Sequence, residues 1–146
     1  MSVPKGKRYE SDLVVINKAN DLTMYTIRIC SNEKKFPKRY RWCVTKNIVE
    51  AAVKMRENIS KANSVHVNDE KSYILRRTYQ QMAMAELAAM NVSMNIAFEL
   101  FDGLKHIPNE KTQEVNIAYW TQELMETKRL LQAWKKSDAE RYKRNA

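Results

Sequence analysis

Lysine and arginine residues are gathered in two blocks of this 146-residue chain, and the chemistry open to them is the binding of polyanions. The first block, residues 34–46, contains six basic residues and no acid. The second block, residues 128–144, contains seven basic residues against Asp138 and Glu140. No Lys or Arg occurs between residues 79 and 104. Cations concentrated in this way can form a positive surface that attracts phosphates, and the net charge of +9 agrees with a nucleic-acid partner.

The residue types that usually carry catalysis or bind metals form no known pattern. His66 and His106 have no partner at ligand spacing, and no Glu is followed three positions later by His, as di-iron bundles require. HExxH, GxSxG, Walker A and GxGxxG strings are absent from the sequence. Cys30 and Cys43 form no CxxC pair, and we expect both to be small buried residues in a reducing compartment. We therefore expect a protein that is not an enzyme and that needs no cofactor and no metal.

Residues that interrupt helices are scarce, which predicts an all-α fold with few, long helices. The chain has only two glycines and three prolines, whereas sheets need many turns. Its 44% of hydrophobic residues suffices for one core. No apolar run approaches the length of a membrane span, and residues 1–12 lack a signal-peptide core, so we expect a cytoplasmic protein. Residues 1–9 are expected to be a flexible basic tail and residues 10–146 a single domain.

Apolar spacing predicts the first two helices. One helix is expected over residues 10–30, and another from about Pro37, which suits a first turn, to about residue 63. The predicted buried face of the first helix consists of Val15, Ala19, Leu22, Thr26 and Ile29. The predicted buried face of the second helix consists of Val44, Ile48, Ala51, Met55, Ile59 and Ala62.

A third and a fourth helix follow from the same periodicity. Asn68 is expected to cap the third helix, which persists to residue 100 or 101 and ends before Gly103 and Pro108. Asn109 is expected to cap the fourth helix. The third helix carries a heptad-like stripe formed by Leu75, Thr78, Met82, Ala85, Ala89, Val92 and Ile96. The fourth helix carries Ile117, Trp120, Leu124, Thr127, Leu131 and Trp134. Four methionines of the third helix are expected to fill the core; they are Met82, Met84, Met90 and Met94.

Four helices with short connections favour an antiparallel up-down-up-down four-helix bundle. Its first connection would lie at one end, and both chain termini with the start of the third helix at the other. The two basic blocks would then form two poles, or one stripe if the second and fourth helices are neighbours. The candidate nucleic-acid-binding residues are Lys35, Lys38, Arg39, Arg41, Lys46, Arg76, Arg77, Lys128, Arg129, Lys135, Lys136 and Arg141.

Aromatic residues interleave both basic blocks. Tyr40 and Trp42 lie within the first block, and Tyr142 lies within the second. Exposed aromatic side chains can stack on nucleic-acid bases. Tryptophan is more often part of a protein core, however, so we expect Trp42 to be buried. Contacts from the cations alone would provide affinity and salt dependence without sequence specificity.

Two stretches of the chain resemble the accessory variability determinant (Avd) proteins of diversity-generating retroelements. The second-helix region of those proteins is similar to KFPKRYRWCVTKNIVEAAVKMRENISKAN (residues 35–63). Their last helix resembles IAYWTQELMETKRLLQAWKKSDAERY (residues 117–142). The most specific parts are residues 36–38, 62–63, 119–120 and 134–138. The resemblance covers most of the chain from the first predicted helix onward.

This resemblance implies a four-helix bundle related to the proteins encoded by intervening sequences of large ribosomal RNA genes, assembled as a barrel-like homopentamer. It further implies that a basic surface binds template RNA or an RNA–DNA hybrid, and that the protein assists a reverse transcriptase in mutagenic complementary-DNA synthesis. The alternative is an interaction scaffold of the ribosomal intervening-sequence type, which has no assigned role and whose basic surface is incidental. An enzyme with a metal in the bundle core is a third possibility, which bound metal would reveal.

Overall fold

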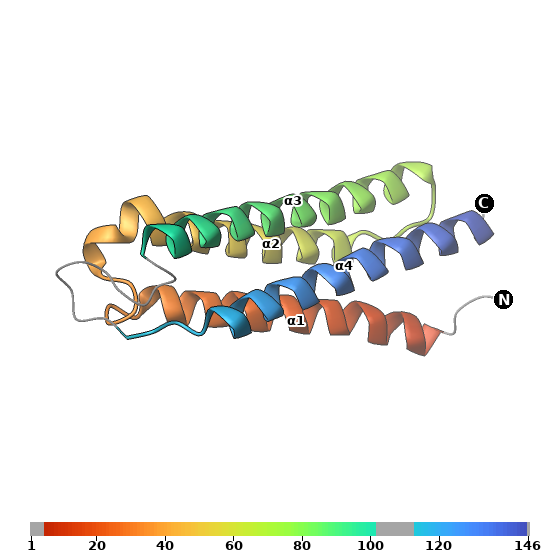
Figure 1. Ribbon diagram of the computed structural model, residues 1–146. Helices are drawn as coiled ribbons and strands as arrows, with labels where there is room; N and C mark the ends of the chain where they lie inside the picture. The colour runs from red at the N-terminus through yellow and green to blue at the C-terminus, as the bar shows by residue number, and fades with distance from the viewer. Residues whose placement is uncertain (1–4, 102–112, 146) are drawn as a thin grey trace.

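The computed structural model describes residues 5–101 and 113–145, and these parts of the chain form four α-helices and no strand. The helices are α1 (Lys5–Ser31), α2 (Lys46–Ser64), α3 (Glu70–Leu100) and α4 (Ile117–Asn145), as Figure 1 shows. The prediction of an all-α fold is therefore confirmed. The expected roles of Gly103, Pro108 and Asn109, and the position of His106, lie outside the described residues.

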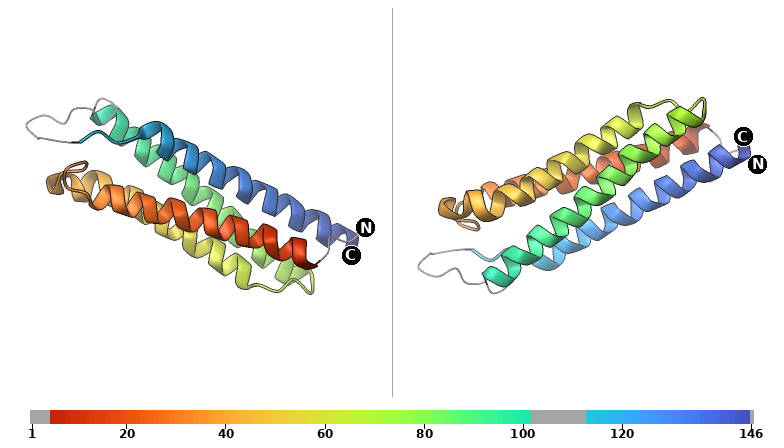
Figure 2. Two further views of the ribbon diagram at one scale, coloured as in Figure 1. Left: turned by 90° about the horizontal axis from the view of Figure 1, so that it is seen from below. Right: turned by 90° about the horizontal axis from the view of Figure 1, so that it is seen from above.

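The start of α1 and the end of α4 lie at one end of the molecule (Figures 1 and 2). We call this end the terminal end; the α2–α3 connection lies there too. Helices α1 and α3 each pack against both α2 and α4, which places α2 and α4 across a diagonal. The two basic blocks therefore do not join into one stripe along neighbouring helices. Residues 34–46, which we call the basic turn, lie at the opposite end, in orange in Figure 1.

Helix α1 begins five residues earlier than its apolar spacing predicted. Residues 5–9, expected to belong to a flexible tail, form its first turns. Their Lys, Arg and Tyr residues are compatible with a helix, and Gly6 costs only about 1 kcal/mol relative to alanine. Residues 5–9 contain Lys, Gly, Arg and Tyr and no aliphatic residue, so an apolar pattern cannot detect this first turn.

The predicted buried faces of α1, α2 and α4 are confirmed. All five residues of the α1 face and all six of the α2 face are buried, and so are five of the six on α4, with Ile117 partly buried against them. Trp120 and Trp134 are the largest side chains of this core. The Trp120 indole donates from Nε1 to the Thr26 hydroxyl at 3.0 Å, a buried hydrogen bond that joins α4 to α1.

The apolar stripe predicted for α3 lies on the surface. Val92 is 58% exposed and Ile96 is 54% exposed, and Leu75, Met82 and the rest of the stripe also face solvent. The residues of α3 that are buried are Arg76, Gln80, Ala83, Leu87, Met90, Met94 and Ala97. This face opens with two polar residues, whereas the exposed stripe begins with an apolar one, so periodicity alone identifies the exposed stripe and not the buried face. Of the four methionines expected in the core, two are buried, Met84 is partly buried and Met82 is exposed.

The cap of α3 is Asp69 rather than the predicted Asn68. Asp69 Oδ1 accepts from the Ser72 backbone N–H at 2.8 Å, and Ser72 Oγ accepts from the Asp69 N–H at 3.1 Å. These reciprocal bonds form a capping box, which satisfies two of the donors that a helix start leaves unpaired. At the start of α4, Asn116 Oδ1 accepts from the Tyr119 N–H at 3.0 Å.

The segment that leads into α2 is irregularly wound. Pro37 precedes a short 3₁₀ helix, Lys38–Tyr40, and a π-helical turn, Arg41–Thr45, which continues into α2. This segment is anchored by Phe36, buried edge-on against Trp120, and by Tyr40, whose ring lies 4.7 Å from that of Phe101. None of the described helices is both long and apolar enough to cross a bilayer.

Candidate nucleic-acid interface

The basic turn presents its cations to solvent because its apolar residues are fixed in the core. Phe36, Pro37 and Val44 are buried and Tyr40 is partly buried, whereas most of the residues between them are exposed. Lys38, Arg39, Arg41 and Lys46 are exposed, and Lys35 is partly exposed. Five of the twelve predicted site residues are thus brought together at one end of the molecule.

Acidic neighbours neutralise Arg41 and Lys46 only weakly. The Arg41 guanidinium lies 3.9 Å from Glu33, and the Lys46 ammonium lies 3.8 Å from Glu50. Both pairs are solvent-exposed and long, and such pairs contribute little stability. Among the described residues, Lys35 and Lys38 take part in no ion pair. The charges of Lys35, Lys38, Arg41 and Lys46 therefore remain available to an incoming anion.

Two aromatic side chains of the basic turn have different environments. The Tyr40 ring packs against the core, and its hydroxyl accepts from Arg39 Nη2 at 2.8 Å, while the guanidinium lies 4.8 Å from the ring centroid. Trp42, by contrast, is 74% exposed, and the Lys46 ammonium lies 5.0 Å from its ring centroid. The prediction that Trp42 is buried is therefore wrong. The spacing contained a signal: two positions from the buried Val44 correspond to about 200° around a helix.

The two cysteines also differ in exposure. Cys30 is buried, as predicted, and burial raises the pKa of its thiol to about 12. Cys43 is exposed, so the prediction that both cysteines are buried is wrong for this one. Cys43 lies between Trp42 and Val44 on the outer side of the π-helical turn.

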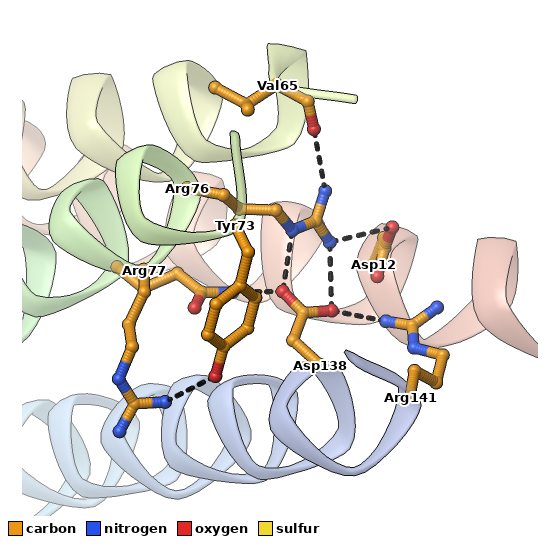
Figure 3. Close-up of polar contacts among 8 residues, drawn as sticks. Asp12, Val65, Tyr73, Arg76, Arg77, Asp138 and Arg141 are labelled. Carbon is orange, nitrogen blue, oxygen red and sulfur yellow. Dashed lines mark hydrogen bonds and ion pairs between the residues drawn. The ribbon is translucent and has the colours of Figure 1, made fainter. Parts of the chain in front are cut away.

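At the terminal end, Arg76 is a structural residue rather than a free cation. Only 8% of it is exposed, and its guanidinium donates to Asp138 from Nε at 2.6 Å and from Nη2 at 3.2 Å (Figure 3). The same guanidinium lies over the Trp134 ring at 4.9 Å. Its charge is already paired with Asp138, so Arg76 is not part of the interface that we propose.

Asp138 organises a network that joins three helices. Gln80 Nε2 donates to it at 2.8 Å, and Arg141 forms an ion pair with it (Figure 3). Asp12 of α1 lies 3.6 Å from Arg76. Burial raises the pKa of Asp12, although the positive charges of Arg76 and Arg141 oppose this shift. Arg141 is therefore also engaged by carboxylates inside the protein.

A pocket of about 560 Å³ opens beside this network, between α1, the α2–α3 connection and α4. Two arginines line it, Arg76 and Arg141, and both are already bound to Asp138. Four carboxylates also line it; they are Asp12, Asp69, Glu70 and Asp138. An excess of carboxylates repels phosphate, so this hollow does not suit a nucleic-acid backbone.

The remaining predicted cations are spread along α4 and the start of α3. Arg77 donates to the Tyr73 hydroxyl at 3.3 Å. Burial lowers the pKa of Lys135, and the positive charge of Arg77 lowers it further. Arg129 hydrogen-bonds Glu126, which raises the pKa of Arg129. Lys136 is exposed and Lys128 is partly exposed. These residues come from two helices rather than from one short segment.

Tyr142 of the second block is also occupied. Its ring stacks face to face on Tyr73, with centroids 4.1 Å apart and planes 4° from parallel. This contact joins the end of α4 to the start of α3 and covers one face of the ring. Of the aromatic residues that interleave the two blocks, Trp42 is therefore the most open to a ligand.

Comparisons with known protein families, with curated proteins and with solved structures find no match for this chain. Within the described parts of the chain, no group of three or more His, Cys, Asp and Glu residues is arranged to hold a metal ion. The arguments about function therefore depend on the residues themselves.

Proposed function

We propose that this protein is a non-catalytic, homo-oligomeric accessory protein that binds nucleic acid through the basic turn. The observation that carries the proposal is the display of Lys35, Lys38, Arg41 and Lys46 at one end of the molecule, where Lys35 and Lys38 form no ion pair with the described residues and the pairs of Arg41 and Lys46 are long and exposed. The ligand we propose is template RNA or an RNA–DNA hybrid, and the partner is a reverse transcriptase, as the resemblance to Avd proteins implies. The antiparallel up-down-up-down bundle belongs to the same proposal.

Substitutions within the basic turn test this site. The variant Lys38→Gln, Arg41→Gln, Lys46→Gln removes three positive charges from the proposed interface. The matched control Lys54→Gln, Lys61→Gln, Lys71→Gln removes three exposed charges from α2 and α3, outside both basic blocks. RNA binding is measured by fluorescence anisotropy over a range of salt concentrations.

The salt dependence distinguishes specific phosphate contacts from the effect of net charge. Each phosphate contact to a single strand contributes about 0.7 to the slope of log K against log salt concentration. The basic-turn variant should therefore lose about 2 from the slope, and the control much less. Equal losses in the two variants would show that net charge alone attracts RNA and would reject the basic turn as the site.

A surface for self-association is available on α3. The exposed stripe from Leu75 to Ile96 is apolar except for Thr78, and the charged residues between 79 and 100 are Glu86 and Glu99 alone. Exposed apolar surface of this extent is typical of interfaces, and a seven-residue repeat suits a helix of a second copy. The occupant we propose is another copy of this chain, in the homopentamer that the resemblance implies.

Sedimentation velocity tests this assembly. The variant Val92→Glu, Ile96→Glu places two charges at the C-terminal end of the stripe and should yield monomers. Both residues are exposed in the single chain, so the helical content of a monomer should not change. A wild-type protein that sediments as a monomer at all concentrations would contradict self-association.

The alternative, a scaffold of the ribosomal intervening-sequence type, makes a different prediction. It requires the α3 surface but not the basic turn, so the protein would assemble without binding RNA. The location of the gene separates the two: an adjacent reverse transcriptase with template and variable repeats favours the accessory protein, whereas a position inside a ribosomal RNA gene favours the scaffold.

A further inference from the structure

Trp42 is an exposed tryptophan surrounded by cations. It is 74% exposed, whereas Trp120 and Trp134 are almost completely buried. Its neighbours in sequence are Arg41 and, one helical turn later, Lys46, whose ammonium contacts the ring. Exposing an indole leaves a large apolar surface in water, and nothing in the core requires it at this position.

The local backbone holds this side chain outward. Trp42 lies in the π-helical turn, Arg41–Thr45, in which Val44 and Thr45 are the buried residues. Thr45 Oγ1 donates to the Arg41 carbonyl at 3.2 Å, which supports this winding. π-Helical turns are rare and often occur at functional sites. The indole is therefore presented by a folded element and not by a loose chain.

We propose that Trp42 is a base-stacking platform, which makes the basic turn a site for single-stranded nucleic acid. This inference rests on the proposed function, because it assumes that the basic turn binds nucleic acid. Sites of this class combine a basic surface that follows the backbone with an aromatic ring on which an unpaired base stacks. Trp42 provides the ring, and Lys38, Arg41 and Lys46 provide the cations around it.

The chemistry of the site favours single strands over duplexes. In a duplex both faces of each base are covered by neighbouring bases, so an indole on a convex surface can stack only at an end. An unpaired base has an open face and pays little to turn towards the ring. Lys46 covers part of the indole in the free protein, and its flexible ammonium can move to a phosphate while the base takes its place.

The test uses three probes that share phosphate chemistry and differ in their bases. They are an oligothymidylate of about 12 nucleotides, which lies within common site sizes, an abasic strand of the same length, and a blunt duplex of the same length. Each is bound to wild-type protein, Trp42→Ala and Trp42→Phe, and the dissociation constants are measured by anisotropy at several salt concentrations.

The wild-type protein should bind oligothymidylate more tightly than the abasic strand, by about 5- to 150-fold, the range reported for stacking of one base. Trp42→Ala should lose this preference, with an unchanged salt slope because its cations are intact. Trp42→Phe should retain part of the preference. Because the side chain is exposed, helical content and Tm should not change, which excludes misfolding as the cause of a loss.

Two failures can be told apart. If wild-type protein binds none of the probes at low salt, the proposed function and this inference both fall. If wild-type protein binds oligothymidylate and the abasic strand equally, and Trp42→Ala behaves like wild type, nucleic-acid binding stands and the stacking platform is rejected. In that case an exposed Trp42 would be assigned to a protein partner.

Discussion

Removing the carboxylate of Asp138 should destabilise the protein strongly, because it would leave a buried guanidinium without its partner. Asp138 accepts two hydrogen bonds from Arg76 and one from Gln80, and both members of the ion pair are less than 10% exposed. The variant is Asp138→Ala. Breaking such a pair from one side destabilises proteins by about 3–5 kcal/mol, since the remaining charge stays in a medium of low polarity.

Two other contacts of Arg76 place the expected loss of stability near the lower limit of this range. After the substitution Arg76 still lies 3.6 Å from Asp12 and 4.9 Å from the Trp134 ring centroid, and both contacts partly compensate the charge. We therefore expect a loss of about 3 kcal/mol in the free energy of unfolding. For a chain of this length that loss corresponds to a fall in Tm of about 6–12 °C.

The assay is thermal unfolding followed by circular dichroism, at one fixed protein concentration because self-association would shift Tm. The control is Glu126→Ala, which removes a carboxylate from an exposed ion pair with Arg129 on the same helix. This control should leave Tm nearly unchanged, because exposed pairs contribute little. A fall of less than about 2 °C for Asp138→Ala would refute the reasoning that Arg76 depends on this carboxylate.

Three further predictions concern buried groups. Asp12→Asn should raise Tm at pH 7 more than at pH 4. Burial raises the pKa of Asp12 above 3.8, so the folded state binds this proton more tightly than the unfolded chain does, and stability falls as the pH rises from 3.8 through the pKa of the folded state. An equal effect at both pH values would contradict this. A thiol reagent should modify Cys43 quickly and Cys30 only on unfolding, as mass spectrometry of labelled peptides would show, because burial raises the pKa of the Cys30 thiol to about 12. Thr26→Val should lower the free energy of unfolding by about 1–3 kcal/mol in urea titrations, because it leaves the buried Trp120 N–H without an acceptor; an unchanged midpoint would show that another group accepts this hydrogen bond.

The helices that could be predicted in detail are those with a single apolar face. In α1, α2 and α4 the residues at helical spacing that are apolar are also those that are buried, since no second apolar face competes with them. Helix α3 is apolar on two faces, and its buried face contains Arg76 and Gln80. Polarity along a sequence cannot identify a buried arginine, because its burial depends on Asp138, which is 62 residues away.

The candidate site shows the same limit. The sequence located both basic blocks but could not separate free cations from paired ones, because pairing is a property of distance in space. Arg76, Arg129 and Arg141 have carboxylate partners at short distance. Arg41 and Lys46 have distant ones, and Lys35 and Lys38 have none among the described residues. Residue type alone predicts that Trp42 is buried, whereas its position about 200° around the helix from the buried Val44 predicts that it is exposed.

The amino-acid sequence by itself determined that the chain is helical, where three of its four helices bury their side chains, and that its positive charge falls in two blocks. These properties follow from local spacing and composition. Tertiary structure alone decided which face of α3 is covered, which arginines are neutralised and which tryptophan meets solvent. Each of these depends on contacts between residues distant in the chain, and burial and charge pairing act through space rather than along the sequence.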